Sequence, residues 1–138
     1  HKTVIAYTQM GNVHNPYRKV VLMSYLTEFF KLVADETRLR IIVLLAQEDL
    51  CVCQIYRILN LSQPKYQNTL KVKDLDYVVD ERNEKYILYS LNLKDDVIKK
   101  IVQNIVEHID YYPQLSEDKK GLADKDNYLR QCKTKIID

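Results

Sequence analysis

The sequence predicts a mostly α-helical fold with one small β-hairpin. Apolar residues recur at helical spacing over residues 20–33, 35–46 and 93–112. Two β-rich runs, residues 77–80 and 86–91, flank the charged segment 81–85, a pattern typical of a hairpin. Residues 49–75, directly before the hairpin, read as two short helices joined by a tight turn. Helix, turn, helix and hairpin in this order predict a winged helix-turn-helix, with further helices before and after it.

Length and composition indicate one domain with enough apolar material for a core, because 46% of the 138 residues are hydrophobic. We expect an N-terminal arm at 1–19, a central domain at 20–112 and a C-terminal tail at 113–138. In the tail we expect only a loosely packed short helix, at about residues 123–133. The net charge of +2 is small, so binding to nucleic acid would depend on local clusters of Lys and Arg.

The sequence contains no apolar run near the roughly 18 to 20 residues that span a bilayer, and its start lacks a signal-peptide pattern. We therefore expect a cytoplasmic protein with no membrane partner. Three cysteines, two of them in a Cys-x-Cys pair, favour free thiols in a reducing compartment over a secreted disulfide framework.

The second helix of the 49–75 segment is expected to start near Gln63, capped by Ser62 and with Pro64 in its first turn. Its polar face suits a DNA major groove, since Lys reaches phosphates or guanine and Gln and Asn pair with adenine. An ordinary solvated helix is the alternative, and the hairpin that follows favours DNA. The candidate DNA-binding residues are Ser62, Gln63, Lys65, Gln67, Asn68, Thr69 and Lys71, with Arg82 and Lys85 at the hairpin tip.

The remaining helices are expected to form the scaffold. Asp35 should cap the helix that follows it, with Arg38 and Arg40 on its outer side, and Asp49 should cap a helix over residues 50–59. A long helix over 93–112 should end at Pro113. The apolar stripes of residues 20–33 and 97–109 are too wide for one chain to cover, so we expect a homodimer.

Cys51 and Cys53 are expected in the first turn of the 50–59 helix, where the helix dipole and free N–H groups lower the thiol pKa. Thiolates bind soft ions. Residues two apart on a helix point about 200° from one another, so both sulfurs could bind one ion only if the first turn distorted. That distortion would weaken DNA binding. The alternative is a pair of small buried packing residues.

Three segments carry a family resemblance: residues 30–42 read FKLVADETRLRII, residues 49–55 read DLCVCQI, and residues 61–64 read LSQP. They resemble the signature LADPTRLRIL and the motifs ELCVCDL and LSQP of the ArsR/SmtB family of metal-responsive repressors. The segment 86–92, YILYSLN, is similar to the second wing strand. The resemblance implies a homodimeric repressor, dimerised through its first and last helices, that leaves double-stranded operator DNA on binding a toxic metal or metalloid. Arsenite or antimonite is the inducer it implies first, with cadmium or another thiophilic ion left open and no organic cofactor.

The chain departs from this family at several positions. If Asp76 takes a position that usually holds Gly, residues 70–78 are about one residue shorter than the family pattern, and Asp76 is expected to adopt the left-handed conformation that this position needs. A third thiol ligand is missing near the pair, where Tyr56 stands, which leaves Cys132, His14 or an exogenous ligand. A zinc site known on the family's last helix is matched only in part, by Asp95 and His108, and we do not expect zinc there.

Other classes of protein remain as alternatives. The three His lie in no catalytic motif, so we do not expect an enzyme. A repressor that senses redox state through Cys51, Cys53 or Cys132 is the nearest rival. A DNA-binding winged-helix protein without a metal sensor is the third.

Overall fold

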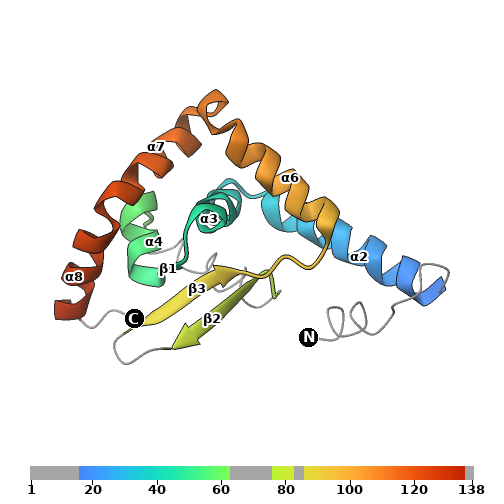
Figure 1. Cartoon of the computed structure of the whole chain (residues 1–138), viewed down its shortest axis with the longest axis horizontal. Helices are drawn as coiled ribbons and strands as arrows, with labels where there is room; N and C mark the ends of the chain where they lie inside the picture. The colour runs from blue at the N-terminus through green and yellow to red at the C-terminus, as the bar shows by residue number, and fades with distance from the viewer. Residues whose placement is uncertain (1–15, 63–75, 83–85, 136–138) are drawn as a thin grey trace.

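The computed structural model describes residues 16–62, 76–82 and 86–135, and the side chains of 23–62, 76–82 and 86–131. The elements, shown in Figure 1, are α2 (Pro16–Val33), α3 (Glu36–Gln47), β1 (Leu50–Cys51), α4 (Val52–Leu59), β2 (Val78–Arg82), β3 (Ile87–Leu91), α6 (Asp96–Glu107), η2 (Ile109–Tyr111), α7 (Pro113–Gly121), η3 (Leu122–Asp124) and α8 (Lys125–Lys135). The predicted fold class is confirmed: the structure is mostly helical with a small antiparallel sheet, as in a winged helix-turn-helix. The N-terminal arm that we expected falls largely outside the described residues.

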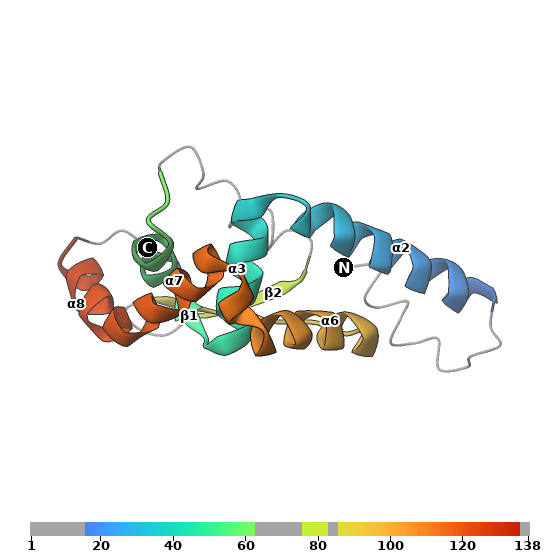
Figure 2. The same cartoon turned by 90° about the horizontal axis from the view of Figure 1, so that it is seen from above.

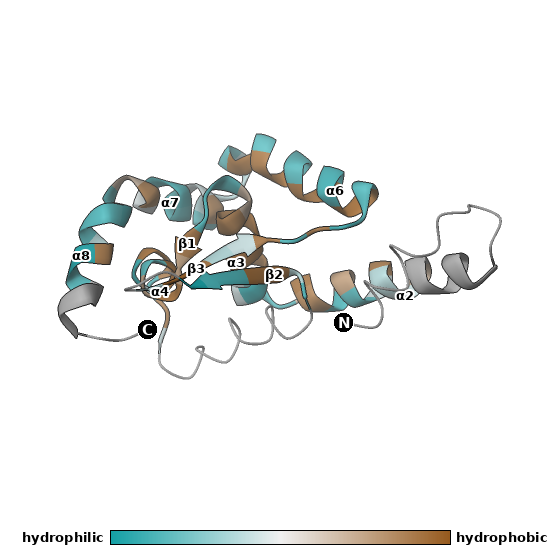
Figure 3. Cartoon of the chain, turned by 60° about the horizontal axis from the view of Figure 1, so that its bottom comes forward, coloured by the Kyte–Doolittle hydropathy of each residue, from teal (hydrophilic) through white to brown (hydrophobic). Residues whose placement is uncertain are grey.

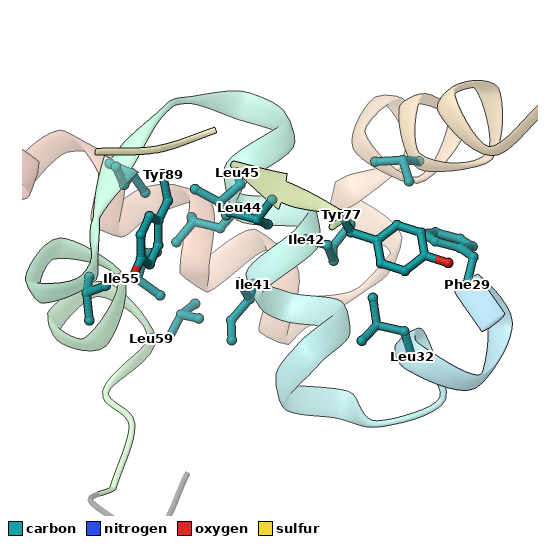
Figure 4. Close-up of a cluster of buried hydrophobic side chains, with 14 of the residues drawn as sticks. Phe29, Leu32, Ile41, Ile42, Leu44, Leu45, Ile55, Leu59, Tyr77 and Tyr89 are labelled. Atoms are coloured by element: carbon teal, nitrogen blue, oxygen red, sulfur yellow. The ribbon is translucent and has the colours of Figure 1, made fainter. Parts of the chain in front are cut away.

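Helix α3 lies at the centre of the hydrophobic core. Ile41, Ile42 and Leu44 of α3 are all at most 1% exposed, because neighbouring elements cover the helix on more than one side. In Figure 4, Phe29, Leu32 and Tyr77 gather on one side of α3, and Ile55, Leu59 and Tyr89 gather on the other. Figure 2 shows α7 and α8 on one side of α3, with α2 and α6 on the other.

The start of α3 confirms one sequence prediction and corrects another. Asp35 is the N-cap, and its carboxylate accepts a hydrogen bond of 2.9 Å from the backbone N–H of Arg38. Arg40 was expected on the outer side of α3, and that is wrong. Its side chain is only 13% exposed because α7 covers this face and supplies Asp118 as a partner.

The sheet has three antiparallel strands in the order β1-β3-β2. The hairpin is confirmed, although β2 continues to Arg82 and makes the connecting tip shorter than expected. The predicted helix over residues 50–59, capped by Asp49, is wrong at its start. Leu50 and Cys51 pair with Tyr89 and Leu88 of β3, so the chain stays extended until Cys51 and helix α4 begins at Val52.

The long helix predicted over residues 93–112 is shorter at both ends and is followed by separate helices. Asp95 caps α6 by accepting hydrogen bonds from the backbone N–H groups of Val97 and Ile98, at 2.7 and 3.3 Å. Pro113 was expected only to end a helix, yet it is the first residue of α7, a position where its missing N–H costs nothing.

The segment expected to be a loosely packed tail forms two packed helices. In Figure 1, α7 and α8 run beside α4. Leu115 of α7 is buried with Val43 and Ile109. Gly121 lies so close to α4 that an added Cβ would be 2.9 Å from Cγ2 of Ile58. Among the described residues, no helix is both long and apolar enough to cross a membrane.

Candidate functional site

Cys51 and Cys53 lie together at the junction between the sheet and α4. Their side chains are 0% and 2% exposed and form one buried cluster, against which Tyr86 and Leu129 pack. Cys51 is the N-cap of α4, with φ −83° and ψ 162°, and Cys53 is in the first turn. Both sulfurs therefore belong to one buried cluster shared by the sheet, α4 and α8.

The position of Cys51 corrects the expected geometry of the pair. We expected both cysteines within a helical turn, pointing about 200° apart. Because Cys51 lies in extended backbone before the helix, that angle does not apply, and the two side chains pack in the same cluster while α4 keeps its helical start. The premise of the distortion argument, two cysteines within one helical turn, is therefore wrong.

The two cysteines differ in redox state. Cys53 is disulfide-bonded, whereas Cys51 keeps its thiol. We expected free thiols at all three positions, and for Cys53 this is wrong. The third cysteine of the sequence, Cys132, lies in α8, and its side chain is outside the described residues. A disulfide-bonded Cys53 has to be reduced before its sulfur can bind an ion as a thiolate.

Other residues named as metal donors have structural partners or lie outside the described residues. Asp95 caps α6, and His108 has its Nδ1 2.8 Å from the carbonyl oxygen of Asn104 and its ring stacked on Tyr111. His14 lies outside the described residues. In the part of the chain that the structure describes, no group of three or more His, Cys, Asp or Glu could hold a metal ion.

Gln54 connects the thiol pair to α8, a role that we did not predict. Its side chain is buried, with Oε1 accepting a hydrogen bond of 2.9 Å from the backbone N–H of Cys51. Its Nε2 donates a hydrogen bond of 2.9 Å to the backbone carbonyl of Lys125, the first residue of α8. A sequence signal did exist, since the family motif ELCVCDL has Asp at this position, which is shorter and carries no N–H donor.

Two further contacts hold α8 against the body of the domain. Arg57 donates from Nη1 to Oε1 of Gln131 at 2.8 Å. Lys125 forms an ion pair with Glu48, and the hydrogen bond to that carboxylate raises the pKa of Lys125. Helix α8 is thus tied to residues on both sides of the cysteine pair.

The end of α4 is held by an ion pair that the sequence did not reveal. Arg40 donates to Asp118 of α7 from Nε and Nη2, at 2.9 and 2.8 Å. Nη2 also donates to the backbone carbonyl of Leu59, at 2.9 Å. The hydrogen bond to Asp118 raises the pKa of Arg40. One guanidinium therefore fixes α3, α7 and the last turn of α4, directly before the segment expected to read DNA.

The candidate DNA-binding residues are only partly described. Ser62 is exposed after α4, and Arg82 is exposed at the end of β2, which Figure 3 draws as hydrophilic over most of its length. Asp76, expected to take a left-handed conformation, does so with φ 62°. The others lie outside the described residues: Gln63, Lys65, Gln67, Asn68, Thr69, Lys71 and Lys85.

Comparison with known proteins finds a family match over the region of the cysteine pair. Residues 35–71, which include α3, β1 and α4, match the helix-turn-helix of the bacterial regulatory protein, arsR family. The helix-turn-helix region belongs to the ArsR/SmtB family. Helices α6, α7 and α8 lie outside the matched residues, so the covering of the thiol pair by α8 is not part of that match.

Three individual regulators are also similar to this chain in sequence. The chain is 38% identical over 65 residues to the arsenic resistance transcriptional regulator ArsR1 of Pseudomonas putida, covering 46% of this chain and 51% of the relative. It is 38% identical over 74 residues to the arsenical resistance operon repressor of Escherichia coli, covering 51% and 63%. It is 26% identical over 84 residues to the transcriptional repressor SmtB homolog of Synechocystis, covering 61% and 63%. The matches span between half and two thirds of these relatives.

Proposed function

We propose that this chain is a DNA-binding transcriptional repressor that releases double-stranded operator DNA when a thiophilic metal or metalloid binds Cys51 and Cys53. The observation that carries the proposal is the buried cysteine pair at the start of α4, the first helix of the helix-turn-helix. Arsenite or antimonite is the inducer we favour, because two relatives are named as arsenic resistance regulators and trivalent arsenic prefers thiolate ligands. This role needs no catalysis and belongs in the cytoplasm.

The position of the pair gives a route from ligand to DNA. Cys51 pairs with Leu88 in the strand that forms one side of the wing, and Cys53 lies on α4, which precedes in the chain the segment 63–75 expected to read DNA. An ion that draws the two sulfurs together acts on the wing and on α4 at once. Release follows if the DNA-bound arrangement of these two elements costs more free energy in the ligand-bound state.

The ligand set needs a third donor for a trigonal thiolate site. Cys132, His14 and an exogenous ligand are the candidates, and Cys53 has to be in its reduced form. Titrating the operator complex with arsenite, antimonite, cadmium and zinc, in reduced protein, tests the proposal by gel shift. If none of the four ions changes operator binding, the remaining candidate is a winged-helix DNA-binding protein without a metal sensor.

We also propose that the repressor is a homodimer, with α2 and α6 supplying the contact. Met23 and Phe30 of α2 and Val97 of α6 are 62%, 48% and 58% exposed, which is costly for large apolar side chains in water. Val97 and Ile101 also line an open groove of about 540 Å³ on α6. A symmetric dimer fits the two half-sites of a palindromic operator.

A thiol redox sensor is the second candidate function, favoured by the disulfide at Cys53. Here two thiols would lose two electrons and two protons to a peroxide, which is reduced to water, and the new disulfide would change DNA affinity. Operator binding that responds to peroxide and not to arsenite would select this function.

A further inference from the structure

We propose that, once Cys53 is reduced, α8 is a gate over Cys51 and Cys53, held closed by Gln54 and Arg57, so that a thiol reagent reaches the pair only when α8 leaves α4. This inference rests on the thiol pair of the proposed function and adds the control of access to it. The gate is formed by residues 125–135, outside the part of the chain that matches the ArsR/SmtB family.

Burial of the sulfurs is the first argument. With 0% and 2% exposure, neither cysteine can meet a reagent in the closed structure, because reaction at sulfur requires access from solvent. The side chains packed over the pair are Tyr86 of the wing region and Leu129 of α8. Removal of α8 uncovers one side of the cluster and leaves β1, β3 and α4 in place.

The contacts of α8 are suited to local opening. Gln54 binds its first residue through the Lys125 carbonyl, and Arg57 binds Gln131 six residues later. These two hydrogen bonds and the Lys125–Glu48 ion pair are polar contacts whose groups water can satisfy once the helix lifts. Tyr128 packs against the main core and Leu129 against the cysteines, but no residue from Lys125 to Gln131 is fully buried. Elements held in this way open at lower free energy than the core.

Gln54 is a positioning residue whose two roles can be separated. Its Oε1 accepts from the Cys51 N–H at the start of α4, and its Nε2 donates to α8. Replacement by Glu keeps an acceptor for Cys51 but removes the donor and sets a carboxylate against the Lys125 carbonyl. Gln54→Glu should therefore keep α4 capped while it weakens the closed position of α8.

The test measures thiol access directly. The 138-residue chain carrying Cys132→Ser, which keeps Cys51 and Cys53 as its two cysteines, is reduced and mixed with an aromatic disulfide. Each protein thiolate attacks the reagent disulfide, forms a mixed disulfide and releases one coloured aromatic thiolate. We expect Gln54→Glu to raise the rate at least tenfold and Arg57→Ala to raise it several-fold. Glu117→Gln, an exposed side chain on α7, is the control for the exchange of a carboxylate and an amide and should leave the rate unchanged.

Urea unfolding of each variant separates gating from global unfolding. A rate that rises in Gln54→Glu and Arg57→Ala without a matching loss of global stability supports the gate, as does faster amide hydrogen exchange confined to α8. Unchanged rates in both variants, or a rise that only follows global stability, overturn it. The assay contains neither DNA nor metalloid, so the gate can fail while arsenite still releases DNA, and the reverse result is equally distinguishable.

Discussion

Arg40 of α3 and Asp118 of α7 form a bidentate ion pair, with Nε–Oδ2 and Nη2–Oδ1 distances of 2.9 and 2.8 Å, and their side chains are 13% and 4% exposed. Breaking a buried pair on one side leaves an uncompensated charge, so Arg40→Ala should reduce the free energy of unfolding by about 3–5 kcal/mol. Urea denaturation measures it. Lys99→Ala is the control, because the Lys99–Asp96 pair is exposed and should be worth about 0–1 kcal/mol. Equal losses in the two variants would contradict a structural role for Arg40.

The cysteine pair yields the sharpest functional prediction. Cys51→Ser and Cys53→Ser should each leave operator binding close to wild type and abolish release by arsenite or antimonite, since a trigonal thiolate site cannot survive the loss of either sulfur. Gel shifts with graded arsenite, in reduced protein, measure the response. Release at the wild-type arsenite concentration in both variants would leave the cysteines as packing residues.

Cys132→Ser is a separate and informative substitution. Loss of the arsenite response would identify Cys132 as the third ligand. Retention would favour His14 or an exogenous ligand. The same gel shift, repeated with His14→Ala, distinguishes the last two.

The DNA-binding face predicts two kinds of effect. Arg82→Ala and Lys71→Ala should weaken binding to all sequences and reduce the salt slope by about 1 each, as loss of a phosphate contact does. Replacing Gln67 or Asn68 should affect some base positions selectively. Fluorescence anisotropy at several salt concentrations, with operator and scrambled DNA, measures both. If all four variants bind as tightly as wild type, the assignment of this face is wrong.

The exposed apolar residues predict the oligomeric state. Sedimentation should give about twice the chain mass of 16.4 kDa. Val97→Glu should shift the protein toward monomer, because it places a charge in the apolar contact surface. Lys119→Glu, exposed on α7 outside that surface, is the control. A wild-type monomer at micromolar concentration would remove the dimer and its symmetric operator.

The features that could be predicted from the sequence are those that depend on neighbouring residues. Asp35 caps α3 and Asp76 takes a left-handed conformation because local backbone rules determine both. The missed features depend on distant partners. Arg40 is buried by a residue 78 positions away, and Gln54 binds a carbonyl 71 positions away.

The same reason explains the error at the start of α4. A capping residue followed by an apolar run predicts a helix from Leu50, but pairing with β3 keeps Leu50 and Cys51 extended. Likewise the many charges of residues 113–138 read as a loose tail, although Asp118 pairs with Arg40 of α3 and Lys125 pairs with Glu48. Pattern alone does not reveal which charges are paired.

The distance along the chain between Cys53 and α8 has a consequence for the protein during its synthesis. The two sulfurs leave the ribosome about 70 residues before the helix that covers them. At roughly 5–20 residues per second, the nascent thiols stay uncovered for on the order of ten seconds. In a cell under metalloid or oxidant stress, the sulfurs of a chain still being synthesised would therefore be more accessible to the toxicant than those of a completed chain.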